Sequence, residues 1–142
     1  MTATYQKDDL KFLYPENWTL TDTPEEDHRA IHLESPGGFI VWSVHLHPQD
    51  TDVDFLLDQT VDALRETYPD LELSTDAVEF EEFPGKSFVA LFFCLDFLVR
   101  IRLQVYQTPK HTMLLWYQCE ERDFDQQKIV FQAISTSLMQ SL

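Results

Sequence analysis

Four of the five histidines lie close together in the sequence, and their spacing could serve metal binding. His45 occupies an odd position of an expected strand, residues 39–46, whose even positions are apolar, and His47 follows directly in the same alternation. Successive side chains of a strand point to opposite faces, so both imidazoles leave the apolar core face. His28 and His32 precede the same expected hairpin and belong to the same polar face.

A four-residue Ser-Pro-Gly-Gly turn would place His28 directly across from His45, with His47 diagonal to it or beyond. Three imidazoles within about 5–8 Å could hold zinc, given a carboxylate such as Asp27 or Glu26. The alternative is that these are solvent-facing residues near the end of a sheet, because no helical His-Glu-x-x-His motif accompanies them. No nucleophile elbow, phosphate-binding loop or dinucleotide fingerprint is present either.

Two arginines alternate with apolar residues in a second expected strand, residues 99–107. Arg100 and Arg102 share a face with Tyr106, and the next strand adds Tyr117 beside Arg102. Cations among aromatic side chains could grip an acidic peptide or a ligand carboxylate. The alternative is that both arginines pair with acids from a covering helix or stack on Tyr117.

The turn before this strand carries large apolar residues where polar ones are usual. Its expected two-residue tip is Asp96-Phe97, followed by Leu98, with no Gly, Asn or Pro. The sequence therefore predicts a partner-binding surface at this tip and on the adjoining face. The tip could instead pack under a loop, the face could be covered by a helix, or a homodimer could hide the tip. The predicted partner-binding residues are Phe97, Leu98, Arg100, Arg102, Tyr106 and Tyr117.

Acidic side chains form a third pattern. Asp54, Asp58 and Asp62 recur every four residues of an expected helix, and further acids cluster at residues 25–27 and 79–82. Like charges at this spacing repel weakly, which a solvated face tolerates. The same patches could also attract a basic partner.

Composition narrows the class of protein. The 142 residues fit one domain, 1–142, and an apolar content of 44% allows a core without metal or disulfide staples. The net charge of −15 argues against nucleic acid and against anionic membranes. No apolar run approaches the ~18 residues of a spanning helix, and no signal peptide is visible. We expect a cytoplasmic protein without a cofactor, in which Cys94 and Cys119 lie on opposite sheet faces and form no disulfide.

The elements that position these residues follow an α+β order. Alternating segments predict an antiparallel sheet of about six to eight strands. Two apolar stripes of helical period predict helices over residues 51–68 and 125–139, packed on the sheet as an α/β/α-like sandwich. Thr51 and Asp54 are spaced like a capping box at the start of the first helix.

The turn Tyr14-Pro15-Glu16-Asn17-Trp18 resembles the start of the PsbP/Mog-like superfamily. The ending resembles it too, with Phe131, Ile134, Ser137 and Leu138 on a closing helix after three long strands. The resemblance covers essentially the whole chain as an order of elements, and it implies an antiparallel sheet with helices packed on it.

The functions that this resemblance implies are mostly non-catalytic. Branches of the superfamily include a photosystem II extrinsic subunit, a Ran-binding protein and bacterial chaperones for type VI secretion effectors. We therefore predict a non-catalytic protein-binding or adaptor domain of unknown partner, not an enzyme. The alternatives are a cytoplasmic chaperone for secreted effectors, or a small metal-binding enzyme using His28, His45 and His47.

Overall fold

A computed structural model describes residues 1–24 and 28–142. Alternation of apolar and polar residues gives the strands of this part, and two amphipathic segments give its α-helices. The strands are β1 (Thr2–Lys7), β2 (Leu10–Pro15), β3 (Thr19–Pro24), β4 (Arg29–Glu34), β5 (Val41–Pro48), β6 (Glu72–Asp76), β7 (Gly85–Cys94), β8 (Phe97–Gln107) and β9 (His111–Glu120).

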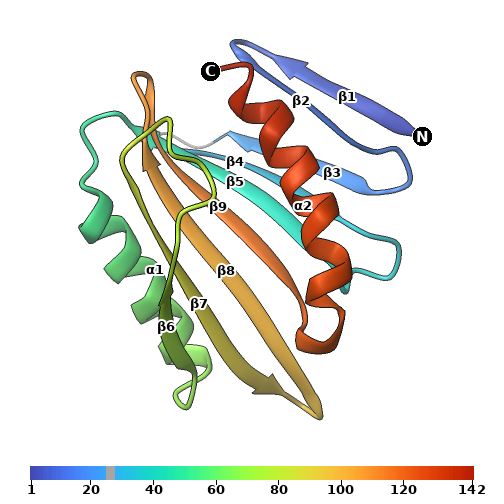
Figure 1. The fold of residues 1–142 in the computed structure, drawn as a ribbon, viewed down its shortest axis with the longest axis vertical. Helices are drawn as coiled ribbons and strands as arrows, with labels where there is room; N and C mark the ends of the chain where they lie inside the picture. The colour runs from blue at the N-terminus through green and yellow to red at the C-terminus, as the bar shows by residue number, and fades with distance from the viewer. Residues whose placement is uncertain (25–27) are drawn as a thin grey trace.

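Seven of these strands form one antiparallel sheet in the order β3-β4-β5-β9-β8-β7-β6 (Figure 1). The expected α+β class with six to eight antiparallel strands is therefore confirmed. Strand β1 was not predicted, and it pairs only with β2 in a separate two-stranded sheet. This hairpin lies against the last helix, where the backbone N–H of Leu13 donates to Ser137 Oγ at 2.9 Å.

Helix α1 (Val53–Thr67) begins one residue later than a cap at Thr51 would require. Asp52 is the N-cap, and its carboxylate accepts a hydrogen bond from the backbone N–H of Phe55 at 3.0 Å. The predicted capping box of Thr51 and Asp54 is therefore wrong. Helix α2 (Phe124–Met139) follows a 3₁₀ turn at Glu121–Asp123.

The two helices cover opposite faces of the sheet (Figure 1). On one face, Leu57 and Leu64 of α1 pack with Leu103 of β8. On the other, Phe131 of α2 packs with Trp42 of β5. The cysteines divide in the same way, since Cys119 belongs to the α2 core, Cys94 packs against the α1 core, and both are free thiols. No helix in the described part of the chain is long and apolar enough to cross a membrane.

Strand registers match the expectation in one hairpin and differ in two. Arg102 lies opposite Tyr117 in the β8–β9 pair, as predicted. The β7–β8 turn is Leu95-Asp96, one residue earlier than predicted. In the β4–β5 pair, His45 lies opposite Ala30 and not His28.

Loop geometry explains the β4–β5 shift. Gly37 and Gly38 both adopt positive φ, and the loop closes with a 2.9 Å hydrogen bond from the Ser35 N–H to the Ile40 carbonyl. The loop is thus six residues long, not four. In both altered hairpins the facing partner moves by two residues, so every side chain stays on its expected face.

Candidate functional site

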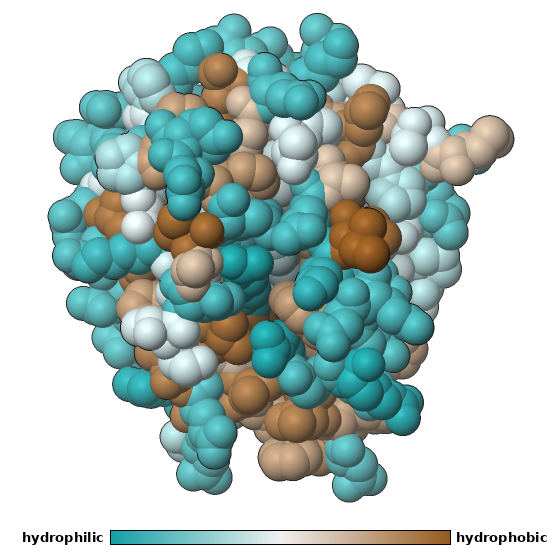
Figure 2. All heavy atoms as spheres, in the orientation of Figure 1, coloured by the Kyte–Doolittle hydropathy of each residue, from teal (hydrophilic) through white to brown (hydrophobic). Residues whose placement is uncertain are grey.

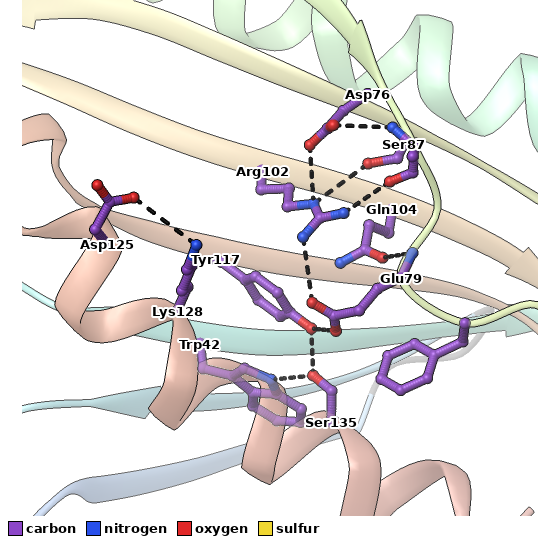
Figure 3. Close-up of polar contacts among 12 residues, drawn as sticks. Trp42, Asp76, Glu79, Ser87, Arg102, Gln104, Tyr117, Asp125, Lys128 and Ser135 are labelled. Carbon is purple, nitrogen blue, oxygen red and sulfur yellow. Dashed lines mark hydrogen bonds and ion pairs between the residues drawn. The ribbon is translucent and has the colours of Figure 1, made fainter.

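The sheet face that carries Arg102 is closed. The guanidinium lies 3.2 Å from Glu79, 3.4 Å from Asp76 and 2.7 Å from the carbonyl oxygen of Ala77 (Figure 3). The side chains of Arg102 and Glu79 are only 13% and 8% exposed. Asp76 ends β6, and the segment between β6 and β7, which crosses this face (Figure 1), supplies Ala77 and Glu79.

A chain of buried hydrogen bonds continues from Glu79 to helix α2 (Figure 3). Tyr117 donates its hydroxyl proton to Glu79 at 2.7 Å, and its oxygen lies 2.5 Å from Ser135 Oγ. Ser135 Oγ also accepts the indole N–H of Trp42 at 2.9 Å. Burial, which disfavours the phenolate, raises the pKa of Tyr117 well above its usual value, so the hydroxyl stays protonated and donates.

The other two predicted residues on this face are also engaged. Tyr106 is fully buried, and its hydroxyl accepts the backbone N–H groups of Glu79 and Phe80. Arg100 forms a bidentate pair with Glu121 and lies 4.8 Å from the ring centre of Phe124. The prediction of an open partner surface on Arg100, Arg102, Tyr106 and Tyr117 is therefore wrong, because α2 and the segment before β7 cover it.

Apolar side chains instead gather at one end of the sheet, around the β7–β8 turn. Leu95 is 90% exposed, Phe39 75%, Phe93 70% and Phe97 46%. Figure 2 shows brown spheres grouped at the lower end of the molecule, where Figure 1 places this turn. Phe39 comes from the β4–β5 loop, so two separate hairpins build this surface. We call Phe39, Phe93, Leu95 and Phe97 the apolar end.

Two hollows flank the turn. One, of about 260 Å³, is lined by Phe39, Leu95 and Phe97 together with Cys94 and Val99. The other, of about 410 Å³, lies on the far side of the turn, and its lining residues include Tyr68, Pro69, Leu71, Phe93 and Leu98. Phe97 and Leu98 thus border hollows, as expected of a binding tip, whereas partner binding by either residue stays a prediction.

Leu95 has an unfavourable backbone conformation for its residue type. It occupies the first position of the two-residue turn with φ 57°. This left-handed region costs an L-residue with a side chain about 1–2 kcal/mol, and hairpin turns place glycine or asparagine there. Strain of this kind in an exposed apolar residue is typical of a functional surface, because packing does not repay it.

Acidic residues surround the apolar end. Asp96 lies in the turn itself, and Asp70 and Glu72 line the larger hollow. None of these three forms an ion pair within the described part of the chain. Unpaired carboxylates beside an apolar surface favour a partner that carries positive charge.

The histidines occupy the opposite face of the sheet, on the side of α1. The rings of His28 and His47 stack with centres 4.9 Å apart and planes 8° apart. His45 borders the same groove but makes other contacts, with Nε2 3.1 Å from Ser43 Oγ and its ring 6.5 Å from that of Trp116. Burial and the neighbouring imidazoles lower the pKa of His45 to about 4.

A zinc site made of His28, His45 and His47 is not assembled. Within residues 1–24 and 28–142 no group of three or more histidine, cysteine or acidic side chains is placed to hold a metal ion. The β4–β5 shift only exchanges the two partners of His28, which now faces His47 and is diagonal to His45. The imidazoles make other contacts instead, since His28 stacks on His47 and His45 lies beside Ser43. The proposed carboxylates Asp27 and Glu26 lie outside the described residues.

The acidic stripe of α1 lies at the surface. Asp54, Asp58 and Asp62 are all exposed, and Asp54 forms an ion pair with Lys86 at 2.5 Å. This arrangement fits a solvated face. A role of the stripe in binding stays a prediction.

Sequence reasoning missed three members of the apolar end: Phe39, Phe93 and Leu95. A turn placed at Leu95-Asp96 keeps the same apolar faces as one placed a residue later, so periodicity does not separate them. The unusual feature was visible, since neither turn contains glycine or asparagine. The approach of Phe39 to this turn depends on the strand order β5-β9-β8-β7, which no local pattern reveals.

No family model matches the chain, and no curated protein matches its sequence. Solved structures do match its fold. The solution structure of cyanobacterial PsbP (CyanoP) from Synechocystis sp. PCC 6803 is 14% identical, with a TM-score of 0.66 over 96% of this chain and 89% of that one. The crystal structure of PA94, a protein of unknown function from Pseudomonas aeruginosa, is 8% identical, with a TM-score of 0.58 over 96% and 95%.

A third match, LpqN of Mycobacterium tuberculosis, described as involved in cell envelope biogenesis, is 13% identical with a TM-score of 0.46 over 88% of this chain and 79% of that one. The likeness to CyanoP gives the chain a PsbP-like fold, as its sequence indicated. At these identities the likeness concerns the fold alone.

Proposed function

We propose that this PsbP-like domain is a non-catalytic binding module that docks a partner protein at its apolar end. The observation that carries the proposal is the exposure of Phe39, Phe93, Leu95 and Phe97 around one turn. Soluble proteins rarely expose apolar groups contiguously unless they bind something there. A rigid sheet supports the surface, because both contributing hairpins belong to it.

The partner is a protein segment with an apolar anchor flanked by lysine or arginine. The hollows beside the turn suit aromatic or aliphatic side chains, which dominate interface energies when they fill pockets. The carboxylates of Asp70, Glu72 and Asp96 attract basic neighbours and speed association. A second copy of this chain is disfavoured, because each copy has a net charge of −15.

One narrower function is a special case of this proposal, and one other function competes with it. A chaperone for secreted effectors is a special case, in which the bound segment is an apolar part of the effector. An enzyme that uses the histidines is disfavoured, because the described residues offer no assembled metal group. We also propose a cytoplasmic location, on the sequence features given above.

Selection from a displayed peptide library tests the proposal. Wild-type protein should enrich peptides that combine an aromatic or leucine side chain with neighbouring lysine or arginine. The Leu95→Asp variant should lose at least about tenfold in affinity for these peptides, because hot-spot changes cost about 2 kcal/mol or more.

Ile129→Asp is the matched control, since Ile129 is an exposed apolar residue on α2, away from both hollows. It introduces the same charge and should leave affinity unchanged. Enriched peptides without this pattern, or peptides that bind the Leu95→Asp variant as tightly as wild type, would contradict the proposal.

A further inference from the structure

A separate groove runs between α1 and the histidine-bearing part of the sheet. Its volume is about 350 Å³, at the lower end of the range of about 300–1,000 Å³ for small-molecule sites. It shares no residue with the two hollows at the apolar end. Its lining residues are His28, His45, His47, Leu56, Gln59, Thr60, Ala63, Leu64, Leu114 and Trp116.

The groove combines an apolar wall with an imidazole wall. Leu56 and Leu64 of α1 and Leu114 of β9 are buried, and Trp116 is half-buried beside them. The opposite wall consists of the histidines of β5 and of His28, which is stacked on His47. A ligand in the groove would thus contact apolar surface along its body and ring nitrogens at one side.

The electrostatics of the groove differ from those of the rest of the chain. No acidic residue lines it within the described residues, although the whole chain has a net charge of −15. Helix α1 presents Gln59 and Thr60 there, while its Asp54 pairs with Lys86 of β7. An anion therefore meets less repulsion here than at the carboxylate-rimmed apolar end.

The charged groups that act on the groove are mainly other imidazoles. His45 interacts electrostatically with His47 of its own strand and with His28 and His32 on the neighbouring β4 side. His32 lies 2.9 Å from the carboxylate of Glu34. Burial first, and then these like charges, lower the pKa of His45 to about 4, and His28 adds to burial in lowering that of His47. Both rings are neutral in the empty groove at neutral pH.

We propose that this groove binds an amphipathic carboxylate, whose apolar body lies on Leu56, Leu64 and Trp116 and whose carboxylate accepts hydrogen bonds from His45 and His47. A bound anion favours the protonated imidazoles, so it raises their pKa values. Binding then takes up protons, and affinity rises as the pH falls until the ligand itself is protonated. The proposal is independent of protein docking at the apolar end.

Two probes of nearly equal shape test it: 4-phenylbutyrate and its neutral amide, 4-phenylbutyramide. Trp116 reports binding, because its indole N–H, 3.0 Å from Gln118 Oε1, gives an NMR signal beside the groove. We expect 4-phenylbutyrate to shift this signal and to bind about tenfold more tightly at pH 6 than at pH 8, a change of about one unit in log affinity. The amide should bind equally at both pH values.

The His45→Gln, His47→Gln double variant should reduce the pH dependence for 4-phenylbutyrate to less than about twofold while the amide still binds, which also shows that the groove is folded. His47→Gln alone, at the more exposed site, should reduce it in part. His111→Gln, outside the groove, should behave like wild type.

Three results would overturn the proposal: neither probe shifts the Trp116 signal, both probes bind with the same pH dependence, or the double variant keeps the full pH dependence. A Leu95→Asp protein should bind 4-phenylbutyrate normally. Failure of this site and failure of the apolar end are therefore distinguishable.

Discussion

The centre of the α2 face and the apolar end both carry residue types that look out of place, and the structure treats them in opposite ways. Arg102 lies in the middle of an aromatic sheet face, and Leu95 lies at the tip of a hairpin. Arg102 finds Glu79, Asp76 and a backbone carbonyl within the same chain. Leu95 is 90% exposed, in a left-handed backbone conformation that is unfavourable for leucine.

The contrast separates an unusual residue with a structural role from one with a functional role. A buried charge must be compensated, so its partners are inside the molecule and its removal costs stability. An exposed apolar residue in strained backbone stabilises nothing in the isolated chain, so its removal should cost binding instead.

The largest expected effect is on stability at the α2 face. Arg102→Leu should lower the free energy of unfolding by about 3 kcal/mol, because the carboxylate of Glu79 stays buried without its cation. Urea unfolding measures the change. Arg122→Leu is the control, since Arg122 is 76% exposed beside Glu120 and should cost less than about 0.5 kcal/mol. Equal losses in the two variants would show that the Arg102 pair is not structural.

Removal of one hydroxyl group from the same network should cost less stability. Tyr117→Phe removes the donor to Glu79 and the partner of Ser135, and it should cost about 2 kcal/mol in thermal or urea unfolding. Tyr14→Phe is the comparison, because the Tyr14 hydroxyl has no hydrogen bond within the described residues. A Tyr117→Phe protein as stable as Tyr14→Phe would refute the network's contribution.

At the apolar end, a substitution should raise the free energy of unfolding and not lower it. Leu95→Gly should raise the free energy of unfolding by about 1 kcal/mol, because glycine adopts φ 57° without strain and the exposed side chain loses no buried contacts. The same variant should weaken the selected peptides. Leu95→Ala keeps the strain, so it should weaken binding without a gain in stability, and stabilisation by both variants alike would contradict the strain argument.

On the histidine-bearing face, titration of His45 should change the free energy of unfolding by about 1 kcal/mol. The folded-state pKa of His45, about 4, lies below its ordinary 6.5, so the unfolded chain binds more protons between these values. Stability from neutral His45 is therefore present above pH 6.5 and lost as the pH falls towards 4. Between pH 7.5 and pH 5.5 wild type should lose about 1 kcal/mol more than His45→Gln. Identical pH profiles would show that His45 is not desolvated.

Periodicity in the sequence predicted which residues share a face, and this carried most of the fold. The arginines, the histidines and both cysteines lie on the faces expected of them. Strand β1 escaped prediction because its alternation is short and weak: only Ala3 and Tyr5 alternate with polar residues, and no position of the strand is buried. The metal prediction failed because alternation places imidazoles on one face but does not fix their ring contacts: His28 stacks on His47, and His45 lies beside Ser43.

Local patterns do not show which segment covers a sheet face. In the sequence, Glu79 is one acid of the cluster at residues 79–82, yet in the structure it covers the Arg102 face from a segment without regular structure. Its partner lies 23 positions away in the sequence. One member of the apolar end, Phe97, was among the predicted residues, because an apolar turn is visible locally.

Site-specific photo-crosslinking in living cells tests the docking surface most directly. A photoreactive phenylalanine analogue replaces Leu95 in one variant and Ile129 in another, so both probes replace exposed apolar residues. We predict a discrete crosslinked partner from position 95 that is absent from position 129 and is lost when Phe97→Asp is added. Equal crosslinking from the two positions, or none from position 95, would contradict it.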